Sequence, residues 1–397
     1  MNSNYFRIGI FLGAFVWSLT ANETAFGQIM LSGNENKVGL ATGNPVPLTT
    51  NVGPDSVSVL DFSHFPPSVS HLMGITNTVV GPPSNIAISP DGRLALIANS
   101  LRVLFPGRTN WAPETHVHVL DLTVTPPQII GRVETELQPS GLSFTPDGRF
   151  ALVANRASGT ISALGIDGKS VKQVAVVKVC EPAENVSDVA ISPDGKLALA
   201  SVQRAGYLAV LKIENGQVSL TGRKLSTYGQ PYRCIITPDG ELGLTAGQGF
   251  GNGIDVDADA ITVVDLKATP MRTIDFVAIG SVPESIEISP NGQLLAAVVM
   301  DGSNLAATDP RHTTKGTLVI LKRKGRTFVV SQRLPVGAVP EGVAFTPDGR
   351  YLVVQCHEDR ELRLFVVRRQ RVRDTGERIH LPGMPSSLRA GPALRPK

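Results

Sequence analysis

One segment recurs six times along this chain, and every copy contains the turn Pro-Asp-Gly or Pro-Asn-Gly. The first copy occupies residues 83–99 (PSNIAISPDGRLALIAN) and the second occupies residues 139–155 (PSGLSFTPDGRFALVAN). The Asp or Asn of the turn stands at positions 91, 147, 194, 239, 291 and 348, so neighbouring copies are 45 to 57 residues apart. Repeats of about fifty residues are typical of propellers and solenoids, in which each repeat buries its apolar surface against the next.

The residues within each copy predict a β-hairpin. Ile86 and Ile88 alternate with smaller residues, as expected for a strand with one buried face. Pro90 presets the backbone dihedral of a tight turn, and Gly92 tolerates the left-handed conformation that follows it. The apolar residues 94–97 then form the returning strand.

Two further strands are expected after each hairpin. The third strand is an apolar run that in two copies ends in Asp, at residues 116–121 (HVHVLD) and 260–265 (AITVVD). Equivalent runs lie at residues 160–164, 207–211, 317–321 and 362–367, and examples of the fourth strand lie at residues 171–177 and 328–333. Four short antiparallel strands without helical segments between them form a propeller blade, so the predicted fold class is all-β.

The two ends of the chain predict a seventh blade. Residues 385–389 restart the inner strand but stop before its turn, whereas residues 37–43, 55–61 and 69–73 resemble strands two, three and four. We therefore expect residues 385–389 to pair with the strand that contains Val38 and Leu40. Such pairing closes the ring and leaves no open sheet edge. The predicted inner strands start near residues 83, 139, 186, 231, 283, 340 and 385.

The N-terminus predicts export. Arg7 precedes an apolar run at residues 8–17, which is too short to span a bilayer, since about 20 residues are needed. Ala25-Phe-Gly27 has the small-x-small pattern of a signal-peptidase site. We expect residues 1–27 to be a signal peptide and residues 28–397 to be a single propeller domain, periplasmic or secreted, with no membrane anchor after cleavage.

The endings ALIAN at residues 95–99 and ALVAN at residues 151–155 resemble the YVTN family of propeller repeats, a group also similar to bacterial lactonase propellers. The resemblance covers nearly all of the mature chain and implies a seven-bladed fold. It carries over no binding residue, because the repeated residues are those that make strands and turns. The lactonase propellers imply, as one alternative, hydrolysis of a sugar-acid lactone at the mouth of the channel.

Hairpin connectivity predicts which face holds a site. The short Pro-Asp-Gly turns lie on one face, so the long and dissimilar loops gather on the opposite, loop-rich face, where function is expected. The predicted ligand-binding residues around its central channel are Asn85, Arg102, Arg156, Asp188, Arg204, Arg233, Glu284, Asp301, Glu341 and His357. Arginines outnumber acids at the ends of the second strands, which favours an anionic ligand such as a carboxylate or sugar acid.

No catalytic motif is recognisable, and we predict no catalytic residue, metal or cofactor. His116 and His118 alternate on a strand without a visible third ligand, and residues 357–359 (HED) are the densest acid/base cluster. No Cys-x-x-Cys-His sequence for haem attachment is present. The formal net charge of +3 argues against a nucleic-acid partner. The three cysteines are widely spaced, so buried free thiols are favoured.

The sequence therefore predicts a monomeric, extracytoplasmic β-propeller that binds a small molecule or a protein partner on its loop-rich face. The first alternative is a lactonase-type hydrolase, which needs a general base and an oxyanion stabiliser at the channel mouth. The second is a subunit of a periplasmic redox complex. Converging acidic and basic groups at the channel mouth favour the hydrolase, and scattered polar residues favour the binding protein.

Overall fold

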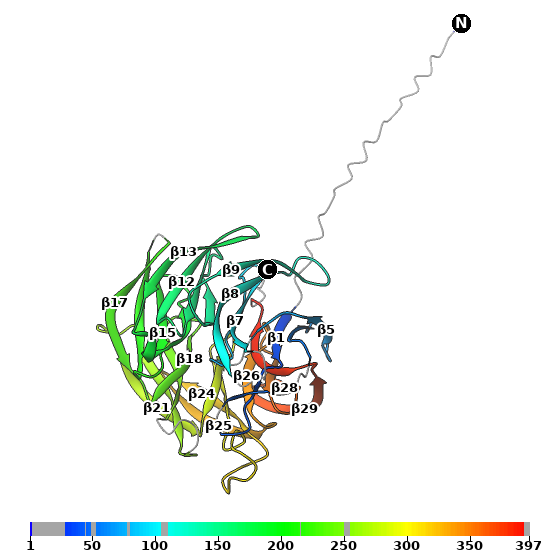
Figure 1. Ribbon diagram of the computed structural model, residues 1–397, viewed down its shortest axis with the longest axis vertical. Coiled ribbons are helices and arrows are strands. Elements are labelled where there is room, and N and C mark those ends of the chain that lie inside the picture. Colours follow the sequence, from blue (N-terminus) through cyan, green and yellow to red (C-terminus); the bar gives the residue numbers. More distant parts are fainter. Residues whose placement is uncertain are drawn as a thin grey trace.

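Seven four-stranded antiparallel sheets surround a central channel and form a β-propeller (Figure 1). The computed structural model describes residues 1, 28–43, 45–48, 53–77, 80–104, 110–214, 216–249 and 255–392. The predicted all-β fold of seven four-stranded blades is confirmed. Among the described residues, no helix is long and apolar enough to cross a membrane. Residues 2–27, which contain the predicted apolar run and cleavage site, lie outside the described residues.

Blades 1 to 6 are each formed by four consecutive strands. Their bounds are β6 (Ile86–Ile88), β7 (Leu94–Val103), β8 (Trp111–Asp121) and β9 (Gln128–Glu134) in blade 1; β10 (Pro139–Phe144), β11 (Phe150–Asn155), β12 (Thr160–Asp167) and β13 (Ser170–Lys178) in blade 2; β14 (Val186–Ile191), β15 (Leu197–Val202), β16 (Tyr207–Glu214) and β17 (Gln217–Ser226) in blade 3; β18 (Gln230–Ile236), β19 (Leu242–Gln248), β20 (Asp259–Asp265) and β21 (Arg272–Gly280) in blade 4; β22 (Pro283–Ile288), β23 (Leu294–Val299), β24 (Thr317–Lys324) and β25 (Thr327–Pro335) in blade 5; and β26 (Pro340–Phe345), β27 (Tyr351–Cys356), β28 (Glu361–Arg368) and β29 (Arg371–His380) in blade 6.

Blade 7 combines the two ends of the chain. Its strand order is β30 (Met384–Ala390), β1 (Ile29–Glu35), β4 (Ser56–Asp61) and β5 (Ser68–Met73). A separate short hairpin of β2 (Val38–Gly39) and β3 (Val46–Pro47) lies between β1 and β4 in sequence, and a 3-10 turn, η1 (Pro182–Glu184), connects blades 2 and 3. The innermost strands contact one another in a closed circle, from β6 through β10, β14, β18, β22 and β26 to β30 and back to β6.

The predicted tight turns close the first hairpin of each of blades 1 to 6. In the first turn, the Gly92 N–H donates to the Ser89 carbonyl at 2.8 Å, and the Ser89 hydroxyl donates to Asp91 Oδ1 at 2.6 Å. The six turn glycines all have φ between +67° and +72°, which a residue with a side chain adopts only with strain. The recurring turn is therefore a local consequence of its own residues.

Ring closure is confirmed, but the predicted partner strand is wrong. Met30 to Glu35 of β1 pair with residues 384–390 of β30, and in Figure 1 the blue strand β1 lies beside the red C-terminal strand. Residues 37–43 do not form the second strand of blade 7; Val38 instead pairs with Pro47 in the β2–β3 hairpin. The reason is burial: Met30 and Leu31 are fully enclosed between neighbouring blades, and residues 29–34 continue the ladder to β4 without a break.

The core of the protein lies between the blades. Seven apolar clusters among the described residues each join two adjacent blades, and together they complete the circle. The cluster between blades 6 and 7, for example, packs Met30 and Leu388 of blade 7 against Val353 and Leu364 of blade 6. The second and third strands of each sheet are thus buried on both faces, and the stability of every blade depends on its two neighbours.

This dependence predicts that Leu388→Ala is strongly destabilising. Leu388 lies on the closing strand β30 and is 1% exposed, so its truncation leaves a cavity between blades 6 and 7. We expect the free energy of unfolding in urea to fall by about 2–5 kcal/mol. The matched control is Met73→Ala on the outer strand of the same blade, where the side chain is 52% exposed. Equal stability of the two variants would contradict closure through β30.

Candidate functional site

A cavity of about 200 Å³ lies at the mouth of the channel on the loop-rich face, opposite the Pro-Asp-Gly turns. Its polar wall consists of Arg156, Gln203, Tyr232, Gln248, Glu284 and Glu341. Leu40, Val282 and Met300 add apolar surface. These side chains come from blades 2 to 6 and from the N-terminal segment, so the cavity exists only in the closed ring.

Two positions of the repeat direct side chains into this cavity. The first directly follows the proline near the start of an inner strand and is occupied by Tyr232, Glu284 and Glu341 in blades 4, 5 and 6. The second is at or directly after the end of the second strand and is occupied by Arg156, Gln203, Gln248 and Met300 in blades 2 to 5. Antiparallel pairing brings the start of the first strand beside the end of the second, so both positions meet at the channel.

Arg156 is the cation of this cavity. Its side chain is partly buried, and its Nη1 atom is enclosed without a hydrogen-bond partner among the described residues. The guanidinium carbon lies 5.9 Å from the centre of the Tyr232 ring, within range of a cation–π interaction. No carboxylate within the described ranges forms an ion pair with it. Burial lowers the pKa of Arg156 and Arg204 adds to this effect, whereas Tyr232 and Glu284 act in the opposite direction.

Two buried carboxyl groups face the same space. Gln248 Nε2 donates to Glu284 Oε1 at 3.0 Å. Glu341 is 1% exposed, and its carboxyl group forms no hydrogen bond within the described part of the chain. Burial raises the pKa of Glu284, and burial together with the charges of Glu284, Glu35 and Glu358 raises the pKa of Glu341 well above its usual value. Both shifts favour the protonated, neutral form of the two carboxyl groups.

His357 lies beside the cavity in a chain of buried charges. The imidazole is fully buried; its Nε2 lies 3.2 Å from Glu35 Oε1, and its Nδ1 lies 3.3 Å from Glu358 Oε1. Burial alone would lower the pKa of His357, but its hydrogen bonds to the two carboxylates outweigh that effect and raise the pKa. The same contact lowers the pKa of Glu358.

Arg233 and Asp188 are buried and do not line the cavity. Arg233 Nη2 pairs with Glu287 Oε2 at 2.6 Å, and its Nε donates to the Ile286 carbonyl at 2.7 Å. The Asp188 carboxylate accepts hydrogen bonds at 2.9 Å from the Ser84 hydroxyl and from the Cys234 N–H. These contacts cross-link different blades. That Arg233 and Asp188 also contact a ligand stays a prediction.

The remaining predicted residues are spread over the loop-rich face. Asn85 donates to the Ala98 carbonyl at 3.3 Å within blade 1, and Asp301 accepts the Ser281 N–H at 2.9 Å within blade 5. Arg102 and Arg204 are exposed. Of the ten residues selected from the sequence, the fold brings Arg156, Glu284 and Glu341 to one cavity and places His357 beside it. Whether these residues bind a ligand stays a prediction.

Gln203 and Tyr232 line the cavity but were not among the predicted site residues. In blade 3 the sequence prediction selected Arg204, which is one residue beyond the position equivalent to Arg156 and points into solvent. Successive side chains of an extended strand point to opposite sides, so a shift of one residue exchanges an inward for an outward group. Exact alignment of the repeats would have identified Gln203, and the residue after Pro231 would have identified Tyr232.

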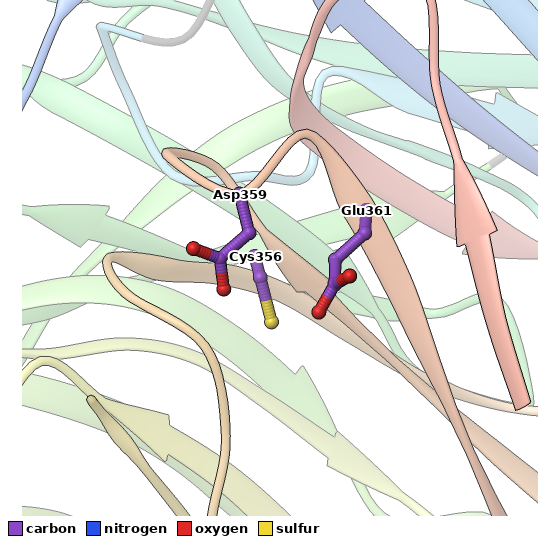
Figure 2. A group of neighbouring side chains, drawn as sticks. All are labelled: Cys356, Asp359 and Glu361. Atoms are coloured by element: carbon purple, nitrogen blue, oxygen red, sulfur yellow. The ribbon is translucent and has the colours of Figure 1, made fainter. Parts of the chain in front are cut away.

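The described residues contain one group of potential metal ligands, formed by Cys356, Asp359 and Glu361 within 4.8 Å of one another (Figure 2). Arg363 already pairs with both carboxylates, through Nη2 to Asp359 at 3.1 Å and through Nε to Glu361 at 2.6 Å. Burial raises the pKa of the Cys356 thiol to about 12, so the sulfur is protonated. This arrangement fits a salt-bridge network better than a metal site.

The three cysteines are buried and free, as predicted. The paired histidines of β8 also have their own partners. The rings of His116 and His118 meet edge to face with centroids 4.9 Å apart, and His118 Nε2 lies 2.9 Å from the Thr76 hydroxyl. Burial lowers the pKa of His118 to about 4, so this ring is neutral.

No family model and no curated protein matches this sequence. Several solved structures do match the structure of this chain. A periplasmic gluconolactonase from Pseudomonas aeruginosa superposes with a TM-score of 0.64 at 19% identity, covering 92% of this chain and 100% of the other. A candidate 6-phosphogluconolactonase from Bacteroides fragilis superposes with a TM-score of 0.68 at 17% identity, covering 91% of this chain and 97% of the other. Hydrazine synthase from Kuenenia stuttgartiensis superposes with a TM-score of 0.57 at 22% identity, covering 74% of this chain and 78% of the other. At these identities the likeness shows the fold: a propeller structurally similar to lactonase-like propellers.

The raised pKa of Glu341 predicts a stability that falls as the pH rises. Between 4.5, the usual pKa of a glutamate, and the raised value, the folded protein binds more protons than the unfolded chain, so unfolding becomes easier with increasing pH. Glu341→Gln cannot lose a proton. We expect its melting temperature to fall less between pH 5 and pH 9 than that of the wild type, by about 2 °C or more.

Thermal melts across that pH range measure the effect. Asp167→Asn, which removes an exposed carboxylate at the β12–β13 turn, is the control and should follow the wild-type profile. A Glu341→Gln profile parallel to that of the wild type would show that the Glu341 carboxyl group is ionised in the folded protein.

Proposed function

We propose that this propeller binds a small organic anion, of the carboxylate or sugar-acid type, in the cavity on its loop-rich face. The observation that carries the proposal is Arg156, a partly buried side chain with an enclosed Nη1 that has no hydrogen-bond partner and with no ion-paired carboxylate among the described residues. A buried charge without a counter-charge is unfavourable by several kcal/mol. A ligand carboxylate at this point would supply the missing charge and two parallel hydrogen bonds.

The rest of the cavity supports the same class of ligand. The carboxyl groups of Glu284 and Glu341 have raised pKa values, so in their protonated form they can donate hydrogen bonds to an anion instead of repelling it. Gln203 and Gln248 add amide groups that suit hydroxyl substituents. The volume of about 200 Å³ lies below the range of about 300–1,000 Å³ that is usual for drug-sized ligands, which favours a small molecule.

We propose an extracytoplasmic location for this binding, from the signal-peptide pattern at residues 1–27. One structurally similar protein is a periplasmic gluconolactonase, which is compatible with that location. We also propose that the protein acts as a monomer.

Substitution of Arg156 tests the proposal. Gluconate serves as the probe, and isothermal titration calorimetry of the full chain measures its dissociation constant. Arg156→Gln removes the guanidinium, so we expect the dissociation constant to rise about 10- to 150-fold, which corresponds to the 1.5–3 kcal/mol of a charge-assisted hydrogen bond.

Arg204→Gln is the matched control, because it removes an arginine at the rim that is exposed and does not line the cavity. It should change the dissociation constant less than twofold. Equal losses in both variants would point to a general electrostatic attraction. Absence of binding by gluconate, acetate and malonate to the wild type would overturn the proposal.

A lactone hydrolase is the second candidate, and the pair of buried carboxyl groups beside Arg156 is the observation that favours it. When two interacting carboxyl groups share one proton, one can act as a base toward water while the other remains an acid. Arg156 could then stabilise the oxyanion that forms on the lactone carbonyl. Under this hypothesis the protein hydrolyses δ-gluconolactone, and Glu341→Gln abolishes the activity; under simple binding, hydrolysis stays at the rate in buffer.

A further inference from the structure

The segment at residues 37–43, which we call the cap segment, covers one side of the cavity. Leu40 and Gly43 form part of the cavity wall. Leu40 and Ala41 pack against Val282, Met300 and Val339 of the neighbouring blades, and the Gly43 N–H donates to the Asn304 carbonyl at 2.8 Å. The cap segment therefore lies where a ligand would enter or leave.

Two carboxylates hold the backbone of this segment. Glu35 Oε2 accepts the N–H groups of Lys37 at 2.5 Å and Val38 at 3.1 Å. Glu358 Oε1 accepts the N–H groups of Leu40 and Ala41, both at 3.3 Å. Four backbone N–H groups of the cap segment thus donate to two acidic side chains that come from opposite ends of the chain.

His357 lies between these two carboxylates and contacts both. Its Nε2 faces Glu35 at 3.2 Å and its Nδ1 faces Glu358 at 3.3 Å. A carboxylate can only accept, and a neutral imidazole has a single N–H, so both contacts are hydrogen bonds only when the ring carries two protons. With a neutral ring, one lone pair of the imidazole would face a carboxylate oxygen.

We propose that protonated His357 clamps the cap segment over the cavity, and that loss of its proton releases the backbone between Lys37 and Gly43 and opens the cavity. The inference rests on the proposed function for its biological meaning, because it describes how access to the proposed ligand site is regulated. The clamp itself can be observed without a ligand.

The charges around His357 set the direction of the switch. Glu35 on β1, Glu358 next to the histidine and Glu341 on β26 face this region, and Glu284 on β22 lies beyond Glu341. Glu35 and Glu358 are the two that contact His357, so removal of the imidazolium leaves these two acidic groups without a counter-charge. Because the pKa of His357 is raised above its usual 6.5, the clamp is complete below that value and is lost as the pH rises through the raised pKa.

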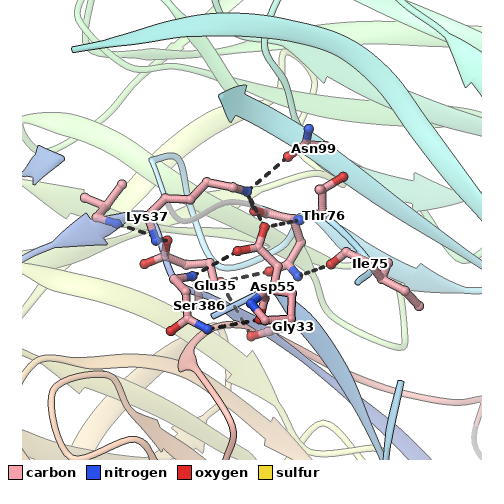
Figure 3. Close-up of polar contacts among 12 residues, drawn as sticks. Gly33, Glu35, Lys37, Asp55, Ile75, Thr76, Asn99 and Ser386 are labelled. Carbon is pink, nitrogen blue, oxygen red and sulfur yellow. Dashed lines mark hydrogen bonds and ion pairs between the residues drawn. The ribbon is translucent and has the colours of Figure 1, made fainter. Parts of the chain in front are cut away.

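The other end of the cap segment is held by a contact that does not involve His357. The Lys37 ammonium pairs with the Asp55 carboxylate and lies 3.4 Å from Asn99 Oδ1, and Figure 3 shows this network beside Glu35. Lys37 is therefore expected to act as one fixed end and the Gly43 N–H bond to Asn304 as the other, so that opening is confined to the residues between them.

Hydrogen–deuterium exchange of the full chain tests the clamp. Peptides that cover residues 37–43 are followed between pH 5.5 and pH 9, with labelling times scaled to the intrinsic exchange rate. We expect the protection of this segment to fall at least about tenfold with rising pH, the change that corresponds to one pKa unit of coupling. In His357→Gln, which cannot carry a charge, protection should be low at every pH.

His71→Gln, which removes an exposed histidine on β5, is the matched control and should keep the wild-type response. Glu358→Gln is a second test should His357→Gln not fold, and it should lower protection at pH 6. Protection that is equal at pH 6 and pH 9 in the wild type, or unchanged in both variants, would overturn the clamp.

Stopped-flow measurement of gluconate association separates the clamp from the ligand proposal. If both hold, association is faster in His357→Gln than in the wild type at pH 6. If exchange shows the pH response but gluconate, acetate and malonate do not bind, the clamp stands and the proposed ligand class is wrong. If gluconate binds and its association rate is the same in both proteins at pH 6, the cavity binds anions but the clamp does not control access.

Discussion

Closure of the ring depends on the contact between β30 and β1, which joins the two ends of the chain in one blade. Each blade is buried on both faces by its neighbours, so an open ring would expose two apolar sheet faces and two unpaired strand edges. Closure also positions the cavity, since its wall is assembled from blades 2 to 6 and from the segment that follows β1. The cavity is thus formed by the arrangement of several blades in the ring and not by any single loop.

The blades repeat, but the cavity does not have sevenfold symmetry. At the position after the inner-strand proline, blades 4 to 6 carry Tyr232, Glu284 and Glu341, whereas the equivalent residues of blades 1 to 3 are serines. Large and ionisable groups therefore gather on one side of the channel. The apolar cap segment, Val282 and Met300 exclude water there, and this low-dielectric environment raises the pKa values of the two glutamates.

Much of the architecture was predictable from local chemistry. In all six turns the glycine has nearly the same φ and its N–H donates to the same carbonyl, because Ser or Thr, Asp or Asn, and Gly determine the turn by themselves. Prediction was less accurate at the ends. Residues 29–35 and 37–43 both have apolar character, and only contact with β30, more than 300 residues away in sequence, selects the first as the strand.

The sequence by itself determined the repeat, the four-stranded blade, the seven-membered ring and the face on which dissimilar loops gather, because periodicity and turn chemistry are local properties. It also identified Arg156, Glu284, Glu341 and His357 as polar groups near the channel. Only the tertiary structure decided that Arg156 lacks a carboxylate partner among the described residues while Arg233 has one in Glu287. Only the structure placed Glu35 and Glu358 on either side of His357. The partners of a buried charge come from strands that are distant in sequence, and their distances and desolvation arise when the ring closes.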